Sequence, residues 1–300
     1  GDSKTPLYFL IVSSFLNIAL DVVFIYFFHT GVGGAAWATV IAQAVSGLLS
    51  LLWIIIKYPE LHVNRRHFSF SSYFVIKHLS IGANMGFQFS ITAIGTVVLQ
   101  GALNKFGPIK IASFTAAQKV EQLVTVAAGV MGITMANYGG QNLGAGRIDR
   151  IKEGVNKAIV ISSSFAVVAA VLAWIFKDQM VSLFLDSKKM SGQEWQEILS
   201  AAGTYLHICS VFFPVLFSIF VYRNILQSIG HGFWPLMGGV FELFARSIAA
   251  YTLPSLIGYA GICAAEPLAW FSAALPLAIA YYITIKKSCL LFADSRWEAK

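Results

Sequence analysis

The stretch PLYFLIVSSFLNIALDVVFIYFFH, residues 6–29, decides the fold of this chain. Its only carboxylate is Asp21, and the rest of the stretch is apolar or uncharged. About 20 apolar residues, rising 1.5 Å each along a helix, cross the hydrocarbon core of a bilayer. The stretch therefore predicts a membrane-spanning helix. Asp21 marks a candidate functional position, because a charge inside the membrane is energetically costly.

Further stretches of the same kind follow along the chain. We predict spans near residues 34–56, 79–104, 109–137, 156–176, 201–226, 233–256 and 262–285. The 300 residues are 57% hydrophobic and 12% charged, whereas about a quarter of a soluble domain is charged. The patterns of a signal peptide and of an outer-membrane barrel are absent. Because lipid cannot satisfy backbone hydrogen bonds, we predict an all-α integral membrane protein with eight transmembrane helices.

The net charge of +7 raises the question of a nucleic-acid partner. The basic residues, however, lie mainly in the loops between the apolar stretches. With the N-terminus inside, the inner segments hold 13 Lys and Arg residues and the outer loops hold 5. Cytoplasmic loops carry such an excess. We therefore predict a multi-pass protein of the plasma (cytoplasmic) membrane with both termini in the cytoplasm, and no nucleic-acid partner.

A passage at the start of the chain recurs near its end. GDSKTPL (1–7) and the helix pair after it resemble GHGFWPL (230–236) and its own helix pair. Self-similarity over a long period indicates a duplicated architecture, which transporters often use. Four predicted helices, in 79–226, precede the later copy. Symmetry therefore predicts four helices upstream of residue 1, and twelve in all.

Several segments in order resemble the multidrug and toxic compound extrusion (MATE) family. They are GDSKTPL (1–7), LNIALDVVFI (16–25), GVGGAAWAT (31–39), FTAAQKVEQL (114–123), YGGQNLGAGRIDRI (138–151), YRNILQSIGHG (222–232) and FELFAR (241–246). Asn84 and Gln88, with no acid in 79–104, are more similar to the DNA-damage-inducible bacterial branch. The resemblance implies two pseudo-symmetric six-helix lobes around a central cavity, and a chain here that lacks the first four helices.

The resemblance also divides the chain. Residues 57–78 are the longest predicted inner polar stretch, which suits a connection between lobes. We expect the last two helices of the N-terminal lobe in 1–57, a cytoplasmic linker in 58–78, a six-helix C-terminal lobe in 79–287 and a cytoplasmic tail in 288–300.

The sharpest candidate site surrounds Asp21. Asn17 lies four residues earlier, hence on the same helix face. Thr39 lies on the next helix, at a depth in the membrane that differs from that of Asp21 by about 4–5 Å. Carboxylate, amide and hydroxyl oxygens suit Na⁺, and the carboxylate alone suits a proton. The resemblance implies a cation-binding role for Asn17, Asp21 and Thr39, completed in the family by an aspartate on the first helix. The alternative is a hydrogen-bond cluster without an ion.

Polar residues within the later helices predict a substrate cavity. We assign to it Asn84, Gln88, Gln118, Glu121 and Arg223. An ion pair inside the lobe is an equal alternative for Glu121. Lys119, two residues away, does not share its helix face.

Glu242 and Arg246 stand at i and i+4, which predicts a structural ion pair. Arg223 has three candidate partners, namely Glu242, Glu266 and Glu121. Glu266 precedes Pro267, and we predict it at a helix start, where an acid suits the helix dipole.

The glycine-rich segment GGQNLGAG (139–146) does not predict a phosphate cradle. It has no preceding strand and no Gly-Lys-Ser/Thr ending. We predict an inner turn there that leads into a surface helix at 147–157.

The function predicted is secondary active multidrug efflux. Cationic or amphipathic drugs or toxic metabolites would leave by alternating access in exchange for Na⁺ or H⁺, with no cofactor beyond that ion. No nucleophile or metalloenzyme pattern indicates an enzyme. We expect a monomer in contact with membrane lipids. The alternatives are a lipid-linked oligosaccharide flippase, for which the predicted cavity has few basic residues, a non-transporting membrane protein, and an inactive fragment.

Overall fold

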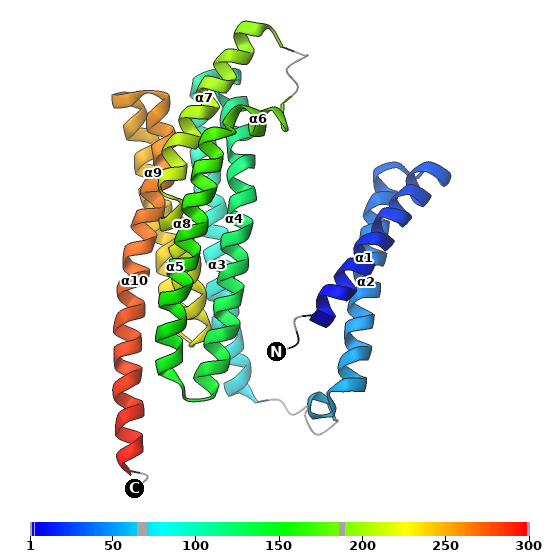
Figure 1. Ribbon diagram of the computed structural model, residues 1–300, viewed down its shortest axis with the longest axis vertical. Helices are drawn as coiled ribbons and strands as arrows, with labels where there is room; N and C mark the ends of the chain where they lie inside the picture. Colours follow the sequence, from blue (N-terminus) through cyan, green and yellow to red (C-terminus); the bar gives the residue numbers. More distant parts are fainter. Residues whose placement is uncertain (1, 3, 65–70, 186–189, 299–300) are drawn as a thin grey trace. The chain divides into compact units, whose positions relative to one another are not determined.

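The computed structural model describes residues 2, 4–64, 71–185 and 190–298, and the side chains of residues 77 and 287–298 lie outside that description. The chain forms two compact units, Gly1–Ser71 and Ser72–Lys300. The described residues hold no strand (Figure 1). The helices are α1 Lys4–Val22, α2 Gly31–Lys57, α3 Ser72–Leu103, α4 Gly107–Gly144, α5 Ile148–Ile175, α6 Lys177–Ser182, α7 Gly192–Val211, α8 Phe213–Ser228, α9 Phe233–Ile257 and α10 Tyr259–Glu298.

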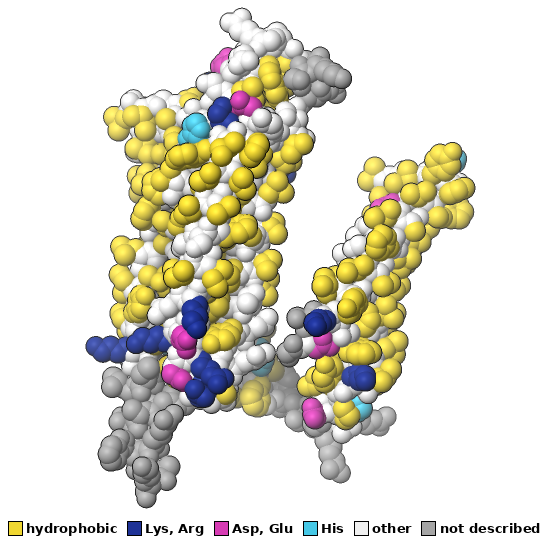
Figure 2. Space-filling view, in the orientation of Figure 1, with side chains coloured by type: hydrophobic (Ala, Val, Ile, Leu, Met, Phe, Trp, Pro, Cys, Tyr) yellow, Lys and Arg dark blue, Asp and Glu magenta, His cyan; other side chains and the backbone are white. Residues whose placement is uncertain are grey.

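Six helical stretches of the described chain are long and apolar enough to cross a membrane. A seventh is added when the bent pair α7 and α8 counts as one span. One of the six, Ser72–Gly144, contains both α3 and α4, joined by the 3₁₀ turn Asn104–Phe106. Hydrophobic side chains cover the sides of each unit (Figure 2). The all-α membrane fold is therefore confirmed, while the number of eight spans stays a prediction.

In the first unit, α1 and α2 pack as a helix pair. Asp2 Oδ1 accepts a hydrogen bond from the Thr5 amide at 3.1 Å, which satisfies an otherwise free donor at the start of α1. Hydrogen bonds from the Thr5 hydroxyl and amide lower the pKa of Asp2. Deeper in the pair, Ser13 Oγ donates to the Ala42 carbonyl at 2.9 Å. Small buried residues of α2 allow close approach of helices, as is common in membranes, and they are Gly34, Ala38 and Ala42.

In the second unit, α9 packs against α3 and α10, and α8 packs against α4, α5 and α10 (Figure 1). Glycines lie where these helices meet. Gly132 of α4 faces Asn224 of α8, and Gly238 of α9 faces Leu277 of α10. Large side chains fill the interior, and those fully buried include Phe114, Tyr205, Phe213, Phe217 and Tyr281. The second unit therefore has its own packed core.

The predicted span 201–226 is not one straight helix. α7 ends at Val211, α8 begins at Phe213, and the two are bent by 52°. Pro214 lies in the first turn of α8, where its missing N–H interrupts the hydrogen-bond ladder. The apolar pattern runs through this point without a change, so it predicted a single helix.

The glycine-rich segment 139–146 also differs from the prediction. α4 continues to Gly144, which leaves only residues 145–147 for the turn. α5 then runs without interruption from Ile148 to Ile175, so the predicted surface helix at 147–157 is wrong as a separate element. Its charged residues occupy the first turns of a long helix.

Gly261, in the first turn of α10, lies against the backbone of α9. A Cβ atom added there would stand 2.5 Å from the Leu253 carbonyl carbon and 2.6 Å from its oxygen. We expect Gly261→Ala to destabilise the protein by about 1–3 kcal/mol, measured as the thermal unfolding midpoint in detergent. Gly140→Ala is the matched control, because nothing lies within 4 Å of an added Cβ there. Equal midpoints for the two variants would contradict the close packing of α9 and α10.

Candidate functional site

Asn17, Asp21 and Thr39 all lie in the helix pair of the first unit. Asn17 Nδ2 donates to Thr39 Oγ1 at 3.3 Å, from α1 to α2. The Thr39 hydroxyl in turn donates to the Ala35 carbonyl at 3.1 Å. Asp21 stands one turn beyond Asn17 on the same face of α1. The structure thus joins Asn17 to Thr39 directly and places Asp21 next to them along α1.

The Asp21 carboxylate has an unmet requirement. Its Oδ1 is buried and has no hydrogen-bond partner within the described residues. A buried polar atom without a partner is destabilising, and a proton or a cation would remove that penalty. The nearby amide and hydroxyl add hard oxygen atoms, which Na⁺ accepts as ligands. The arrangement is therefore chemically suited to one small monovalent cation.

The backbone next to Asp21 is irregular. The π-helical turn Val23–Phe27 begins two residues after it. Thr30 Oγ1 donates to the Phe24 carbonyl at 2.7 Å and so satisfies a carbonyl of this turn. Short π-helical segments occur frequently at functional sites. This irregularity is a second feature, independent of the side chains, that singles out the Asp21 end of α1.

In the second unit, Gln88 and Arg223 come together. Gln88 is only 3% exposed. Its amide lies 3.0 Å from Gln227 Nε2 and 3.2 Å from the Arg223 guanidinium. Asn84, one turn before Gln88, is half-buried and packs against Gly232. The structure therefore places Gln88 and Arg223 in the interior of the unit and Asn84 nearer its surface.

Two arginines and two glutamates form a buried network between α8, α9 and α10. Arg246 Nη2 pairs with Glu242 Oε1 at 2.7 Å and with Glu266 Oε2 at 3.0 Å. Arg223 Nη2 pairs with Glu242 Oε2 at 3.2 Å. Glu242 is thus the partner of Arg223 among the three candidates. These four residues are called the buried network.

The predicted place of Glu266 at a helix start is wrong. α10 begins at Tyr259, so Glu266 lies two turns inside the helix, where it is buried and paired with Arg246. Pro267 follows it within the same helix. A proline in the first turn would have marked a start, but membrane helices also tolerate proline further in, because neighbours satisfy the freed backbone groups.

Glu121 has a hydrogen-bond partner on another helix. Its Oε2 accepts a hydrogen bond from the Tyr205 hydroxyl of α7. Lys119 is exposed and makes no ion pair with it in the described structure. Gln118, three residues before Glu121 on α4, is half-buried. Of the five predicted cavity residues, Gln88 and Arg223 are brought together from different helices.

Tyr205 and Gln227 are the polar partners that sequence reasoning missed. Tyr205 lies in an apolar helix, where an aromatic residue gives no sign of a polar role. Gln227 did carry a signal, since it stands four residues after Arg223 and so shares its helix face.

The MatE family model matches residues 84–252, more than half of the chain. Two relatives from Bacillus subtilis (strain 168) are "Probable multidrug resistance protein YpnP", 26% identical over 77% of this chain and 49% of its own length, and "Probable multidrug resistance protein YoeA", 25% identical over 94% and 61%. A "FAD transporter" of Shewanella oneidensis is 25% identical over 61% of this chain and 42% of its own length. The chain thus spans about two-fifths to three-fifths of the length of these curated relatives.

Solved structures agree on the fold. "Crystal structure of MATE in the bent conformation" matches with a TM-score of 0.87 at 22% identity, over 98% of this chain and 64% of the other. The outward-facing structure of a multidrug resistance MATE family transporter of the MOP superfamily matches with a TM-score of 0.83 at 23% identity, over 94% and 62%. The family model, the sequence relatives and the fold agree, and the chain belongs to the multidrug and toxic compound extrusion (MATE) family.

Proposed function

We propose that this chain contributes to secondary active efflux, in which cationic or amphipathic compounds leave the cell in exchange for Na⁺ or H⁺ by alternating access. The observation that carries the proposal is the buried Asp21 Oδ1, which has no hydrogen-bond partner in the described residues and lies beside the Asn17–Thr39 bond. A cation from outside would bind there and bias the first unit toward the state that releases the drug.

The second unit supplies the residues that contact the drug. Asn84 and Gln118 are half-buried, so they are within reach of a ligand at the surface of this unit. Glu121 is also half-buried, but its carboxylate is bonded to the buried Tyr205 and would reach a ligand only after that bond is released. Gln88 and Arg223 are more deeply placed and would reach a ligand only after a change of conformation. Soft and polar groups with adaptable packing suit a broad range of drugs.

The proposed membrane topology is based on the distribution of the basic residues. Both termini lie in the cytoplasm and the protein works as a monomer in the plasma membrane, with the excess of Lys and Arg on the inner side. A lipid-linked oligosaccharide flippase is not favoured, because two of the curated relatives are of multidrug-resistance type.

Everted membrane vesicles from cells that express the complete gene test this proposal. We expect a Na⁺ or pH gradient to drive accumulation of a fluorescent cationic dye without ATP. A potential of 100 mV contributes about 2.3 kcal/mol, or about a 50-fold gradient, for each net charge that the exchange moves. A one-for-one exchange of a monovalent dye moves no net charge, so it depends on the concentration gradient of the coupling ion alone. An ionophore for the coupling ion should abolish accumulation. Undiminished accumulation after both gradients are dissipated would refute ion coupling.

A further inference from the structure

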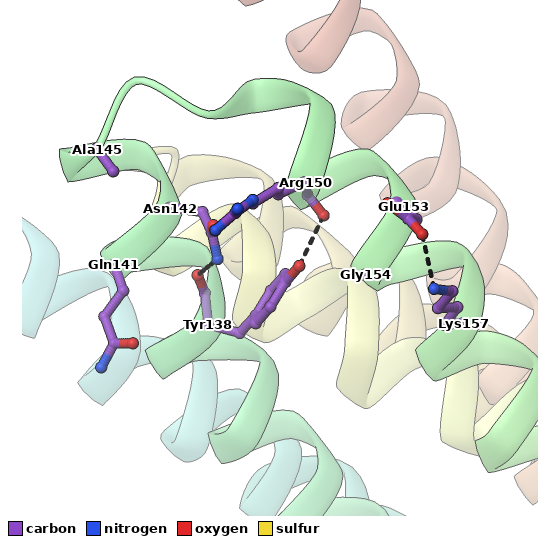
Figure 3. A pocket seen from close by; sticks show the side chains of 8 residues that line it. All are labelled: Tyr138, Gln141, Asn142, Ala145, Arg150, Glu153, Gly154 and Lys157. Atoms are coloured by element: carbon purple, nitrogen blue, oxygen red, sulfur yellow. Dashed lines mark hydrogen bonds and ion pairs between the residues drawn. The ribbon is translucent and has the colours of Figure 1, made fainter. Parts of the chain in front are cut away.

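A polar groove lies where α4 ends and α5 begins, at one end of the second unit (Figure 3). Its volume is about 530 Å³. The polar side chains that line it come from the last turns of α4 and the first turns of α5, and they are Tyr138, Gln141, Asn142, Arg150, Glu153 and Lys157. Figure 2 shows Lys and Arg side chains gathered toward this end of the unit.

The groove is rigid on one side. Tyr138 donates its hydroxyl to the Arg150 carbonyl at 3.0 Å, and Asn142 Nδ2 donates to the Tyr138 carbonyl at 2.8 Å. Gly154 of α5 has no side chain, and a Cβ there would collide with the Tyr138 ring. These contacts fix the distance between the two helices, so the groove exists before any ligand arrives.

The groove holds three charged side chains, and two of them pair with each other. Lys157 Nζ pairs with Glu153 Oε1 at 2.6 Å, which balances those two charges. Arg150 makes no ion pair in the described part of the chain, and its side chain extends toward Asn142 (Figure 3). A guanidinium beside the Asn142 amide is a donor set for an anion, because a fork of N–H groups matches phosphate oxygens.

The position of the groove along α5 corresponds to the surface of the membrane. No charged residue occurs between Lys157 and Lys177. Those 19 positions extend for about 28 Å of helix, close to the thickness of a hydrocarbon core. Lys157 and Arg150 therefore lie at the level of lipid headgroups when α5 crosses the bilayer.

An apolar stripe continues from the groove along the same face of α5. Ile161, Phe165 and Val168 follow Lys157 at spacings of four, four and three residues. Their side chains are 59%, 48% and 57% exposed in the second unit. A polar groove followed by an exposed apolar stripe has the shape and polarity of a headgroup joined to its acyl chains.

We propose that this groove binds the phosphate headgroup of an anionic glycerophospholipid, with Arg150 as the main contact and the acyl chains along the Ile161 stripe. Basic pockets between membrane helices on the cytoplasmic side bind such headgroups. This inference goes beyond the proposed transport and does not depend on it. It gives the protein a fixed lipid contact at the turn between α4 and α5.

Binding of a fluorescent phosphatidylglycerol to the purified full chain in maltoside micelles tests the proposal. We expect saturable binding, followed by anisotropy, that Arg150→Gln weakens about tenfold. Lys152→Gln is the matched control, since Lys152 is an exposed cation of the same helix that does not line the groove. It should change the affinity less than about threefold. Arg150→Lys, which keeps the charge but loses the fork, should give an intermediate affinity.

Competition binding experiments distinguish a lipid phosphate from a soluble phosphate as the ligand. Unlabelled phosphatidylglycerol should displace the probe, whereas phosphatidylcholine with equal chains and millimolar inorganic phosphate should not. Displacement by inorganic phosphate at the same concentration as the lipid would mean a site for a soluble anion and would overturn the proposal. Equal losses in Arg150→Gln and Lys152→Gln would also overturn it, because they would indicate diffuse attraction between charges.

Discussion

Asp21→Asn is expected to abolish ion-coupled efflux while the protein still inserts and folds. The change keeps the shape of the side chain and removes the only carboxylate of the Asn17–Asp21–Thr39 cluster. Because hydrogen bonds and contacts to a charged group contribute about 1.5–3 kcal/mol, we expect the cation affinity of the site to fall about 10- to 150-fold. The amide also cannot carry the proton that a carboxylate would exchange. Drug resistance of cells that express the complete gene should fall to that of cells without it.

The control for this result is Asp149→Asn. It removes the same charge from an exposed carboxylate, whose partner is Arg147 at 2.8 Å. We expect its resistance to equal that of the wild type at equal membrane abundance. Normal resistance in Asp21→Asn would refute the cation site. Loss of the Asp21→Asn protein from the membrane would instead show that Asp21 has a structural role.

The helical membrane fold and its candidate cation cluster could be read from local patterns. A run such as 6–29 is sufficient to predict a membrane helix, because lipid imposes the same length and polarity on every span. Asp21 and Asn17 share a helix face by spacing alone. The depths of Asp21 and Thr39 below one short turn predicted that Thr39 lies near this face of the first helix, and the structure joins Thr39 to Asn17. In each case the relevant distance is fixed by geometry within one helix or one helix hairpin.

In the second unit, contacts between different helices could not be predicted from sequence spacing. Sequence spacing brought Glu242 and Arg246 together because both lie on α9, but it could not choose the partner of Arg223 on another helix. That choice depends on how α8 and α9 are rotated and packed. Tyr205 became the partner of Glu121 for the same reason. The bend at Phe212 was missed because hydropathy does not record a missing backbone N–H.

Arg246→Met is expected to destabilise the second unit more than any change at its surface. Arg246 is 4% exposed and pairs with both Glu242 and Glu266. Its removal leaves two buried carboxylates with only Arg223 to balance them. Breaking a buried ion pair from one side costs about 3–5 kcal/mol. The measurement is the thermal unfolding midpoint in detergent, with the monodisperse fraction in size-exclusion chromatography as a second readout.

Two further variants test whether the lost stability comes from the unbalanced buried charge. Arg147→Gln breaks the exposed pair with Asp149, where the side chains are 45% and 65% exposed, and should change stability by less than about 1 kcal/mol. Arg246→Met combined with Glu266→Gln removes one positive and one negative charge and leaves the Arg223–Glu242 pair intact. Because no uncompensated charge then remains in the buried network, the double variant should recover most of the lost stability. If the double variant were as unstable as Arg246→Met alone, lost packing around the arginine, not its charge, would be the cause.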